Sequence, residues 1–296
     1  MTEKRVTVAS CQVTLVVGDV EANRRSVRSA VTQAADAGAQ VVVLPELANT
    51  GYMFADIDEL RAVAESVVGP TVSEWVTLAA EYGLIIVGGF AEAEGSDRPA
   101  DPAQAEGARR VYNSAVIVDS TGVRACYRKA HLWNTEKADL FTPGTGVPPV
   151  VDTAVGRIGV MVCYDLEFPE WVRTVALEGA DLLCCPVNWP LYPAPQGERP
   201  IEVVKVQAAA ATNRMFVAAA DRAGRERGQD WLGGSVIVDA DGFPLTTLGL
   251  GKAGIHLARL DLSEARNKTI SELNDVHADR RPELYFAAEK RAHGTA

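Results

Sequence analysis

The sequence predicts an α/β fold in which two similar halves form a four-layer α-β-β-α sandwich. Four apolar, strand-like segments of the first half recur in the same order in the second half, and helix-like stretches separate the first three in each half. Each repeated unit has an apolar sheet face that must be covered. The two units are therefore expected to pack sheet against sheet, with their helices outside.

Strands open both halves and lead into helices. Residues 5–11 (RVTVASC) and 157–163 (RIGVMVC) are rich in β-branched and apolar side chains, as buried strands are. Each leads through a helix-like stretch to a second apolar strand that begins with a Gly-Ala pair, at residues 38–45 and 179–186. The remaining matches are a third strand and then a hairpin with an Asx-Gly-type turn in each half, at residues 83–88 and 116–122 and at residues 214–219 and 236–242.

Both repeats lie within residues 1–262, which are expected to form a single domain. Residues 91–110, rich in Glu, Asp, Pro, Ala and Gly, are expected to form a surface loop before the first hairpin. Residues 263–296 lie outside both repeats as a C-terminal arm, in which residues 275–286 combine charges with aromatic anchors. A solvated tail is the alternative, but it would leave the anchors unused, so we expect the arm to dock on a partner subunit.

Composition favours a cytoplasmic enzyme. Of the 296 residues, 47% are hydrophobic and 23% charged, as in soluble globular proteins. The net charge of -10 and the pI near 5.0 disfavour nucleic acid and anionic membranes as partners. The first residues lack the apolar core of a signal peptide, and we expect no membrane span. Five cysteines that form no disulfide framework fit a reducing compartment.

No cofactor and no metal are expected. The four histidines include no pair with HxxxH spacing. Cys184 and Cys185 are adjacent, so their side chains should point to opposite faces of a strand. The sequence contains no zinc-type ligand spacing, no G-x-G-x-x-G fingerprint and no Walker A motif.

Cys163 stands where a buried strand gives way to a helix. The residues after it turn polar, and Pro169 occupies a plausible first position of a helix that runs to about Glu178. A helix dipole favours a nearby thiolate over the thiol, which makes Cys163 a candidate nucleophile. Its counterpart in the first half, Cys11, has no such helix start. The alternative is that Cys163 is a small buried hydrophobe.

A catalytic thiol needs a general base and a group that stabilises an oxyanion. Glu46 follows an apolar strand through Pro45, so it should lie at the carboxyl end of a central strand, where the sites of α/β proteins form. Lys129 comes just after the return strand of the first hairpin. The alternatives are a glutamate in solvent and a solvated basic pair, Arg128-Lys129.

Three separated motifs resemble the nitrilase superfamily of carbon–nitrogen hydrolases, and the resemblance covers nearly the whole chain. They are Leu44-Pro45-Glu46 with Gly51-Tyr52, residues 127–132 (YRKAHL) and residues 163–170 (CYDLEFPE). The resemblance implies that Glu46 is the general base and that Cys163 is the nucleophile, which forms a thioester. Lys129 and the backbone N–H of Tyr164 would then hold the oxyanion. It also implies the four-layer sandwich and a homodimer or larger homo-oligomer.

The superfamily resemblance suggests further site residues. Many members carry a second glutamate after the lysine, and Glu136 is the candidate here. Its spacing to Pro143-Gly144 is one residue longer than expected, so a solvated loop glutamate is the alternative. The candidate substrate-binding residues are aromatic groups that could equally serve packing: Tyr52, Trp133, Tyr164 and Trp189.

The motifs favour an amidase. True nitrilases usually have Cys-Trp-Glu at the nucleophile, whereas this chain has Cys163-Tyr164-Asp165, which disfavours nitriles. We therefore expect hydrolysis of small aliphatic amides to a carboxylic acid and ammonia. Hydrolysis of N-carbamoyl compounds or of ω-amides of dicarboxylates is the alternative, and Arg173 could then bind a carboxylate, although an outward helix residue is more often structural. A non-enzymatic protein that keeps the fold is disfavoured by the intact catalytic set.

Overall fold

Two β-sheets form the centre of the molecule. The computed structural model describes residues 5–95, 110–138 and 140–285. The larger sheet has seven strands, of which five follow the order β1-β2-β3-β4-β5. These five are β1 (Val6–Thr14), β2 (Val41–Val43), β3 (Ile85–Ala93), β4 (Val111–Asp119) and β5 (Gly122–Arg128). Two later strands, β10 (Arg222–Ala223) and β14 (Gly254–Leu260), both pair with β1.

The second sheet repeats the order of the first. Its five strands run in the order β13-β9-β8-β7-β6. They are β6 (Val150–Asp152), β7 (Arg157–Val160), β8 (Leu182–Pro186), β9 (Phe216–Ala220) and β13 (Val236–Val238). The strands β7, β8, β9 and β13 correspond to β1, β2, β3 and β4, with parallel pairing up to the last, antiparallel step in both halves. The predicted internal repeat is therefore present in the fold.

The halves differ in their hairpins. In the first half β4 and β5 form the predicted hairpin. In the second half β13 returns through a turn at Asp239, but only one bridge, Val238 to Pro244, takes the place of a second strand. The halves also exchange their last strands, because β6 follows the first half yet pairs with β7, and β14 follows the second half yet pairs with β1. This reciprocal pairing joins the two repeats into one body.

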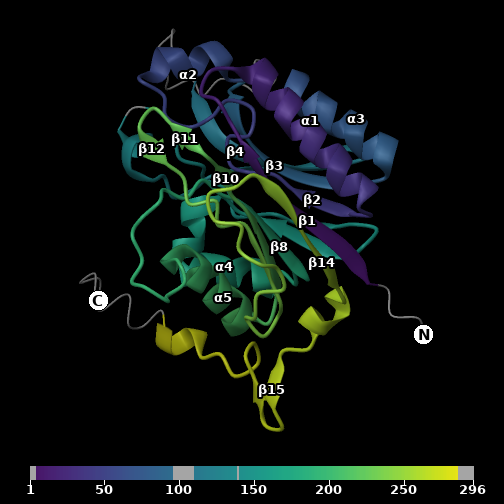
Figure 1. The fold of residues 1–296 in the computed structure, drawn as a ribbon. Coiled ribbons are helices and arrows are strands. Elements are labelled where there is room, and N and C mark those ends of the chain that lie inside the picture. The colour runs from purple at the N-terminus through teal and green to yellow at the C-terminus, as the bar shows by residue number, and fades with distance from the viewer. Residues whose placement is uncertain (1–4, 96–109, 139, 286–296) are drawn as a thin grey trace.

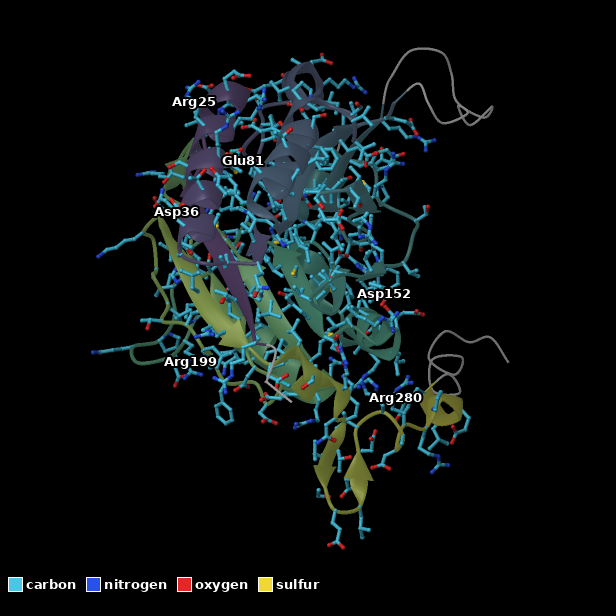
Figure 2. The ribbon with its side chains drawn as sticks, turned by 90° about the vertical axis from the view of Figure 1, so that its right-hand side faces the viewer. Arg25, Asp36, Glu81, Asp152, Arg199 and Arg280 are labelled. Carbon is cyan, nitrogen blue, oxygen red and sulfur yellow. The ribbon has the colours of Figure 1, made fainter. Side chains whose placement is uncertain are left out.

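Helices cover both outer faces (Figure 1). Helices α1 (Val20–Asp36) and α3 (Pro70–Tyr82) lie along the larger sheet, whereas α4 (Pro169–Leu177) and α5 (Ile201–Asn213) lie on the opposite side of the molecule. The outward side chains of α1 and α3 include charged groups, as Arg25, Asp36 and Glu81 illustrate in Figure 2. Four layers result, α-β-β-α, as predicted. None of the helices in the described ranges is long and apolar enough to cross a bilayer.

Local signals determine where the helices begin. The side chain of Asp19 accepts a hydrogen bond from Ala22 N and caps α1, while α3 and α4 each begin with a proline. The remaining helical elements are short: α2 (Ile57–Val63) and the 3₁₀ turns η1 (Asn134–Lys137), η2 (Cys163–Glu167) and η3 (Leu262–Arg266). Two small hairpins complete the fold: β11 (Arg225–Glu226) with β12 (Gln229–Asp230), and β15 (Thr269–Ser271) with β16 (Asn274–Asp275).

Alternation along the central strands builds two apolar layers. In β2, Val41 and Val43 face the layer between the sheets, where they join Ile158 and Val160 of the second sheet. Val42 faces the other way, into the layer under α1 and α3. This period of two is the pattern of a strand buried on both faces. The parallel pairing of the central strands places their carboxyl ends at one edge of each sheet.

Two predictions, the surface loop at residues 91–110 and the C-terminal arm, can be compared with the described residues. The predicted surface loop begins later than residue 91, because β3 continues to Ala93 and Glu92 pairs with Tyr112 of β4. Most of that predicted loop, residues 96–109, lies outside the described residues. The described part of the C-terminal arm contacts its own chain, since Lys268 Nζ donates to the carbonyls of Asn213 and Arg214 at 3.1 and 2.8 Å. Docking of the arm on a partner remains a prediction.

Gly89 lets β3 pass closely behind Glu46. Gly89 N–H donates to Pro45 O at 3.1 Å, and Ala48 N–H donates to Gly89 O at 2.8 Å. A Cβ on Gly89 would lie only 2.6 Å from Glu46 Cα and 2.8 Å from Pro45 O. Because these are backbone atoms held by hydrogen bonds, they cannot move aside cheaply.

We predict that Gly89→Ala lowers the free energy of unfolding by about 1–3 kcal/mol, because it overpacks this crossing. Urea denaturation followed by circular dichroism measures the change. Gly146→Ala is the control, since a Cβ there meets no atom within 4 Å. Equal stability of the two variants would contradict the close approach.

Candidate active site

Lys129 is a buried cation held between two carboxylates. Lys129 directly follows β5, and its backbone N–H donates to Asn113 O of β4 at 2.8 Å. Its Nζ donates to Glu46 Oε1 at 2.7 Å and to both carboxylate oxygens of Glu136 at 3.0 and 2.9 Å. All three side chains are inaccessible to solvent. A buried charge is tolerated only when it is paired, so the position of this ammonium group depends on both glutamates.

Glu46 lies just beyond the carboxyl end of β2. Its backbone N–H donates to Val187 O at 3.4 Å, at the end of the neighbouring sheet. Its Oε1 accepts from Lys129 and from Asn113 Nδ2, the latter at 2.7 Å, whereas its Oε2 has no protein partner. The solvated alternative for Glu46 is therefore wrong. One oxygen is anchored, and the other is available for chemistry.

Glu136 reaches the same lysine from η1. Its Oε2 accepts from Trp133 N at 2.7 Å, and its Oε1 accepts from Asn113 Nδ2 at 2.8 Å. The solvated-loop alternative is wrong, because Glu136 is fully buried. The structure thus brings the predicted second glutamate to the Lys129 ammonium despite its unexpected spacing.

Asn113 is a site residue that the sequence analysis missed. Its single amide group donates to both Glu46 and Glu136, and its backbone carbonyl receives Lys129 N–H. The available signal was a polar Asn113-Ser114 step inside the apolar strand β4. A polar residue buried in a central strand is costly unless its hydrogen bonds are satisfied, and here the two carboxylates satisfy the amide donor.

Cys163 opens the 3₁₀ turn η2 three residues after β7 ends. Its φ of 46° is left-handed, which is uncommon for a residue other than glycine and is often found at functional sites. Its Sγ lies 3.9 Å from Asn188 O, and the residue retains partial solvent access. Electrostatic interactions couple the thiol to Glu46, Lys129 and Glu136. The four predicted catalytic residues are therefore within one charged cluster.

The expectation of a dipole-stabilised thiolate is wrong. Burial raises the pKa of Cys163 well above its ordinary value, and the negative charge of Glu46 raises it further, while Lys129 opposes both. The five-residue turn η2 separates Cys163 from the start of α4 at Pro169, and the effect of a helix dipole falls off within about one turn. Cys163 rests as a thiol and needs a base to become a nucleophile.

Glu46 has the pKa that such a base requires. Burial raises the pKa of its carboxyl to about 7, with Lys129 opposing the shift and Glu136 adding to it. The main cause is the loss of solvent around the carboxylate, which Lys129 offsets only in part. Near neutral pH, Glu46 can therefore both take up and release a proton.

Asp165 joins two of the sequence motifs and was also missed. Its Oδ1 accepts from His131 N at 3.1 Å and lies 2.7 Å from His131 Nδ1. Its Oδ2 accepts from Tyr127 OH at 2.8 Å and from Val162 N at 3.2 Å. This buried carboxylate therefore ties the segment that carries Lys129 to the turn that carries Cys163.

The predicted aromatic residues divide into two groups. Tyr52 interacts electrostatically with Glu136, Glu46 and the Cys163 thiol, so it lies at the charged cluster. Trp133 and Tyr164 meet edge to face with their ring centroids 4.8 Å apart. Trp189 is only 6% exposed and belongs to the apolar core between the sheets, so the packing alternative fits it better than substrate binding.

Arg173 lies on α4, where its guanidinium donates to backbone carbonyls of Thr212 and Val276. These contacts support its structural interpretation.

The described residues contain no group of three or more His, Cys, Asp or Glu side chains that could hold a metal ion.

The chain segments at residues 187–190 and 221–234 form a wall beside Cys163. Two buried carboxyl groups hold this wall. Asp221 accepts from Trp189 N at 3.0 Å and from Gly234 N at 2.9 Å, and burial raises its pKa to about 7. Glu226 accepts from Tyr52 N at 2.9 Å and pairs with the buried Arg222 guanidinium at 2.9 Å. The wall is therefore rigid, because its backbone is fixed by charged side chains.

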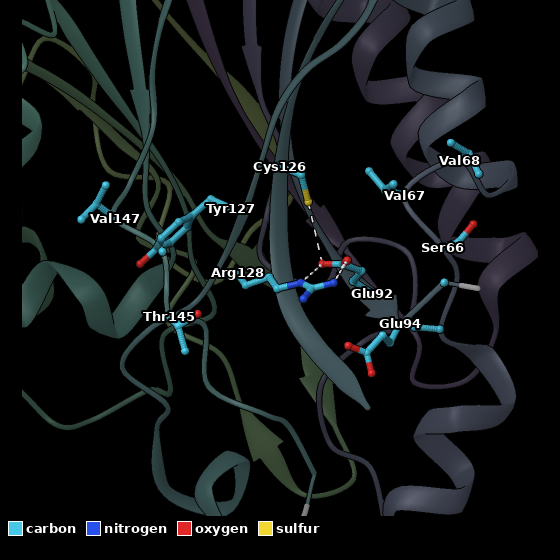
Figure 3. Close-up of a pocket in the computed structure, with 13 residues that line it drawn as sticks. Ser66, Val67, Val68, Glu92, Glu94, Cys126, Tyr127, Arg128, Thr145 and Val147 are labelled. Atoms are coloured by element: carbon cyan, nitrogen blue, oxygen red, sulfur yellow. Dashed lines mark hydrogen bonds and ion pairs between the residues drawn. The ribbon is translucent and has the colours of Figure 1, made fainter. Parts of the chain in front are cut away.

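A separate pocket of about 370 Å³ lies on the other face of β5 (Figure 3). There Arg128 Nε donates to Glu92 Oε2 at 2.9 Å, and Cys126 Sγ lies 3.8 Å from the same oxygen. Successive side chains of an extended chain point to opposite faces, so Arg128 serves this pocket while Lys129 serves the charged cluster. The predicted alternative of a solvated Arg128-Lys129 pair is wrong.

Comparisons with known proteins agree with this architecture. A family model described as carbon-nitrogen hydrolase matches residues 7–268. A relative named nitrilase, from Pyrococcus abyssi, is 35% identical over 282 residues, which cover 95% of this chain and 99% of that protein. A relative named deaminated glutathione amidase, from Homo sapiens, is 33% identical over 94% of this chain and 83% of that protein.

Solved structures of similar fold are also known. The crystal structure of an amidase from Nesterenkonia sp. has a TM-score of 0.75 and 27% identity, covering 97% of this chain and 98% of that one. A mutant of that amidase shows covalent addition of the acetamide moiety of fluoroacetamide at its active site cysteine.

We predict that Cys163 contributes no thiolate below pH 9.0, the ordinary thiol value, because burial and Glu46 disfavour the charged form. The measurement is the ultraviolet thiolate absorbance of the wild type minus that of Cys163→Ala across a pH titration. In urea-unfolded protein the same difference should titrate near the ordinary value. A step in the folded protein below pH 9.0 that vanishes in Cys163→Ala would refute the prediction.

Proposed function

Because the chain belongs to the carbon–nitrogen hydrolase family of the nitrilase superfamily, and is thus a hydrolase acting on amides, we propose that it is a cysteine-dependent amidase for small aliphatic amides. The products would be a carboxylic acid and ammonia. The observation that carries the proposal is the buried Lys129 ammonium between Glu46 and Glu136, with Glu46 Oε2 unpartnered and the Cys163 thiol in the same electrostatic cluster.

Glu46 begins the reaction as the general base. Its carboxylate takes the proton of the Cys163 thiol as Sγ attacks the amide carbonyl carbon. The carbonyl oxygen becomes an oxyanion, which Lys129 and the backbone N–H of Tyr164 stabilise. Protonated Glu46 then gives its proton to the departing nitrogen, the C–N bond breaks, and ammonia leaves an acyl thioester on Cys163.

Water completes the cycle with the same glutamate. Glu46 removes a proton from water as the hydroxide adds to the thioester carbonyl. The C–S bond breaks, the thiolate regains the proton from Glu46, and the carboxylic acid leaves. One residue can serve as base and acid in turn because its pKa of about 7 lies near the working pH.

Two neighbouring substrate classes are the alternatives. The human relative is named deaminated glutathione amidase, and ω-amides of dicarboxylates, together with N-carbamoyl compounds, are the second candidate. The Pyrococcus abyssi relative is named a nitrilase, but the Cys163-Tyr164-Asp165 sequence makes nitriles the less favoured substrate.

The proposal extends to assembly and location. We propose a cytoplasmic enzyme that forms a homodimer or a larger homo-oligomer, with the arm of residues 263–296 docked on the partner subunit. Exposed apolar side chains in this arm support the docking, among them Leu273 at 87% exposure and Ile270 at 59%.

We predict that Cys163→Ala abolishes ammonia release from propionamide, because no other group can form the thioester. The assay would test short aliphatic amides, N-carbamoyl amino acids and nitriles with the wild type and the variant. Cys126→Ala removes an exposed thiol and is the matched control, expected to retain activity. Turnover that survives in Cys163→Ala would overturn the proposed mechanism, and turnover of nitriles alone would overturn the substrate class.

We predict that kcat/KM falls as the pH falls below about 7, since Glu46 must be ionised to act as the base. Glu136→Gln should move this acid limb to lower pH, because the negative charge of Glu136 raises the pKa of Glu46. The measurement is the pH profile of kcat/KM. Glu81→Gln, on the exposed face of α3, is the control and should leave the limb in place. A limb that stays fixed or moves upward in Glu136→Gln would contradict the assignment.

A further inference from the structure

Two buried polar side chains on the wall beside Cys163 have no protein partner. Asn188 is 3% exposed, and neither its Nδ2 nor its Oδ1 meets a hydrogen-bonding group of the protein. Trp231 is 2% exposed, and its Nε1 also lacks a partner. Leaving such groups unsatisfied costs about 1–3 kcal/mol each, so each needs an explanation.

The backbone of Asn188 is held beside the nucleophile. Its carbonyl contacts Cys163 Sγ at 3.9 Å. Val187 before it donates to Ala220 O at 2.9 Å, and Trp189 after it donates to Asp221 Oδ1 at 3.0 Å. Both neighbours are thus hydrogen-bonded to the core, while the amide side chain between them is buried without a protein partner.

Trp231 lies on the same wall. It forms a bridge with Pro190, and Leu232 N donates to Trp189 O at 2.8 Å, so the chain around residue 231 runs alongside the chain that follows Asn188. Its ring meets Tyr52 edge to face at 5.4 Å, and Tyr52 interacts electrostatically with Glu136, Glu46 and the Cys163 thiol. The unpartnered indole N–H therefore belongs to a ring that packs against a residue of the charged cluster.

The charges around the site indicate which kind of substrate group would bind to Asn188 and Trp231. The two cations that interact with Glu46, Lys129 and Arg222, are each paired with carboxylates, Arg222 with Glu226 at 2.9 Å. An anionic acyl chain would meet Glu46 and Glu136 with both of these cations already occupied. A neutral group that both accepts and donates a hydrogen bond matches an amide side chain and an indole N–H.

We propose that Asn188 and Trp231 form a subsite for a neutral polar group, a hydroxyl or a second carboxamide, on the acyl chain of the amide substrate. This inference rests on the proposed amidase function and specifies its substrate class. A site built to hydrogen-bond a hydroxyl discriminates strongly against an analogue that lacks it, because its own polar groups are then left unpaired. The protein should therefore prefer hydroxylated amides to their apolar isosteres.

Isosteric substrate pairs test the subsite. Glycolamide is compared with propionamide, and 3-hydroxypropionamide with butyramide, through kcat/KM measured by ammonia release. In the wild type we expect the hydroxylated member of at least one pair to be favoured by about tenfold or more. Asn188→Leu should lower that ratio by about tenfold, and Trp231→Phe, which keeps the ring but removes the N–H, should lower it by a smaller factor.

The ratio separates recognition from structure. A variant that only perturbs the fold loses both members of a pair in proportion, so an unchanged ratio in Asn188→Leu and Trp231→Phe would overturn the subsite. A wild type without preference for either hydroxylated amide would overturn it as well. Trp75→Phe makes the same chemical change in the outer core and should leave the ratio unchanged. If the wild type hydrolyses none of the four amides, the proposed function itself fails.

Discussion

One buried ammonium group between two carboxylates organises the site. Lys129, Glu46 and Glu136 come from the ends of β5 and β2 and from the turn η1, and all three are fully buried. Removing one member of such a cluster would leave an uncompensated buried charge, at a cost of about 3–5 kcal/mol. The ends of β2 and β5, the turn η1 and the close contact of Gly89 with Glu46 must therefore be in place before the three charged side chains can pair.

A second carboxylate extends this constraint to the nucleophile. Asp165 binds Tyr127 and His131, which flank Lys129 in sequence, and it also holds Val162 N next to Cys163. The first half of the chain supplies the charges and the second half supplies the thiol. The same two halves are also joined by strand exchange, because β6 pairs with β7 and β14 pairs with β1. Strand exchange and the hydrogen bonds of Asp165 therefore both fix the position of one half relative to the other.

The sequence could predict much of this fold, because a repeat of apolar segments has a direct structural meaning. The repeat predicts that the two sheets share a common arrangement of strands, as β1 to β4 and β7, β8, β9 and β13 do. Residues whose role lies in a motif, such as Glu46 and Lys129, could be placed by resemblance. Asn113 and Asp221 could not, because their partners are backbone groups and carboxylates that come close only after folding. The thiolate expectation for Cys163 failed for a related reason, since a pKa depends on burial and on neighbouring charges.

The burial that raises the pKa of Glu46 also explains why the cluster needs no histidine. Loss of solvent disfavours the charged carboxylate, Lys129 offsets part of this effect and Glu136 adds to it, so Glu46 binds a proton near neutral pH. Lys129 and Asn113 both donate hydrogen bonds to Glu46 Oε1. The proton is thus left to the free oxygen, Glu46 Oε2. A carboxyl tuned in this way gains the proton affinity of an imidazole, while the raised pKa of Cys163 ensures that the thiol gives up its proton only to such a base.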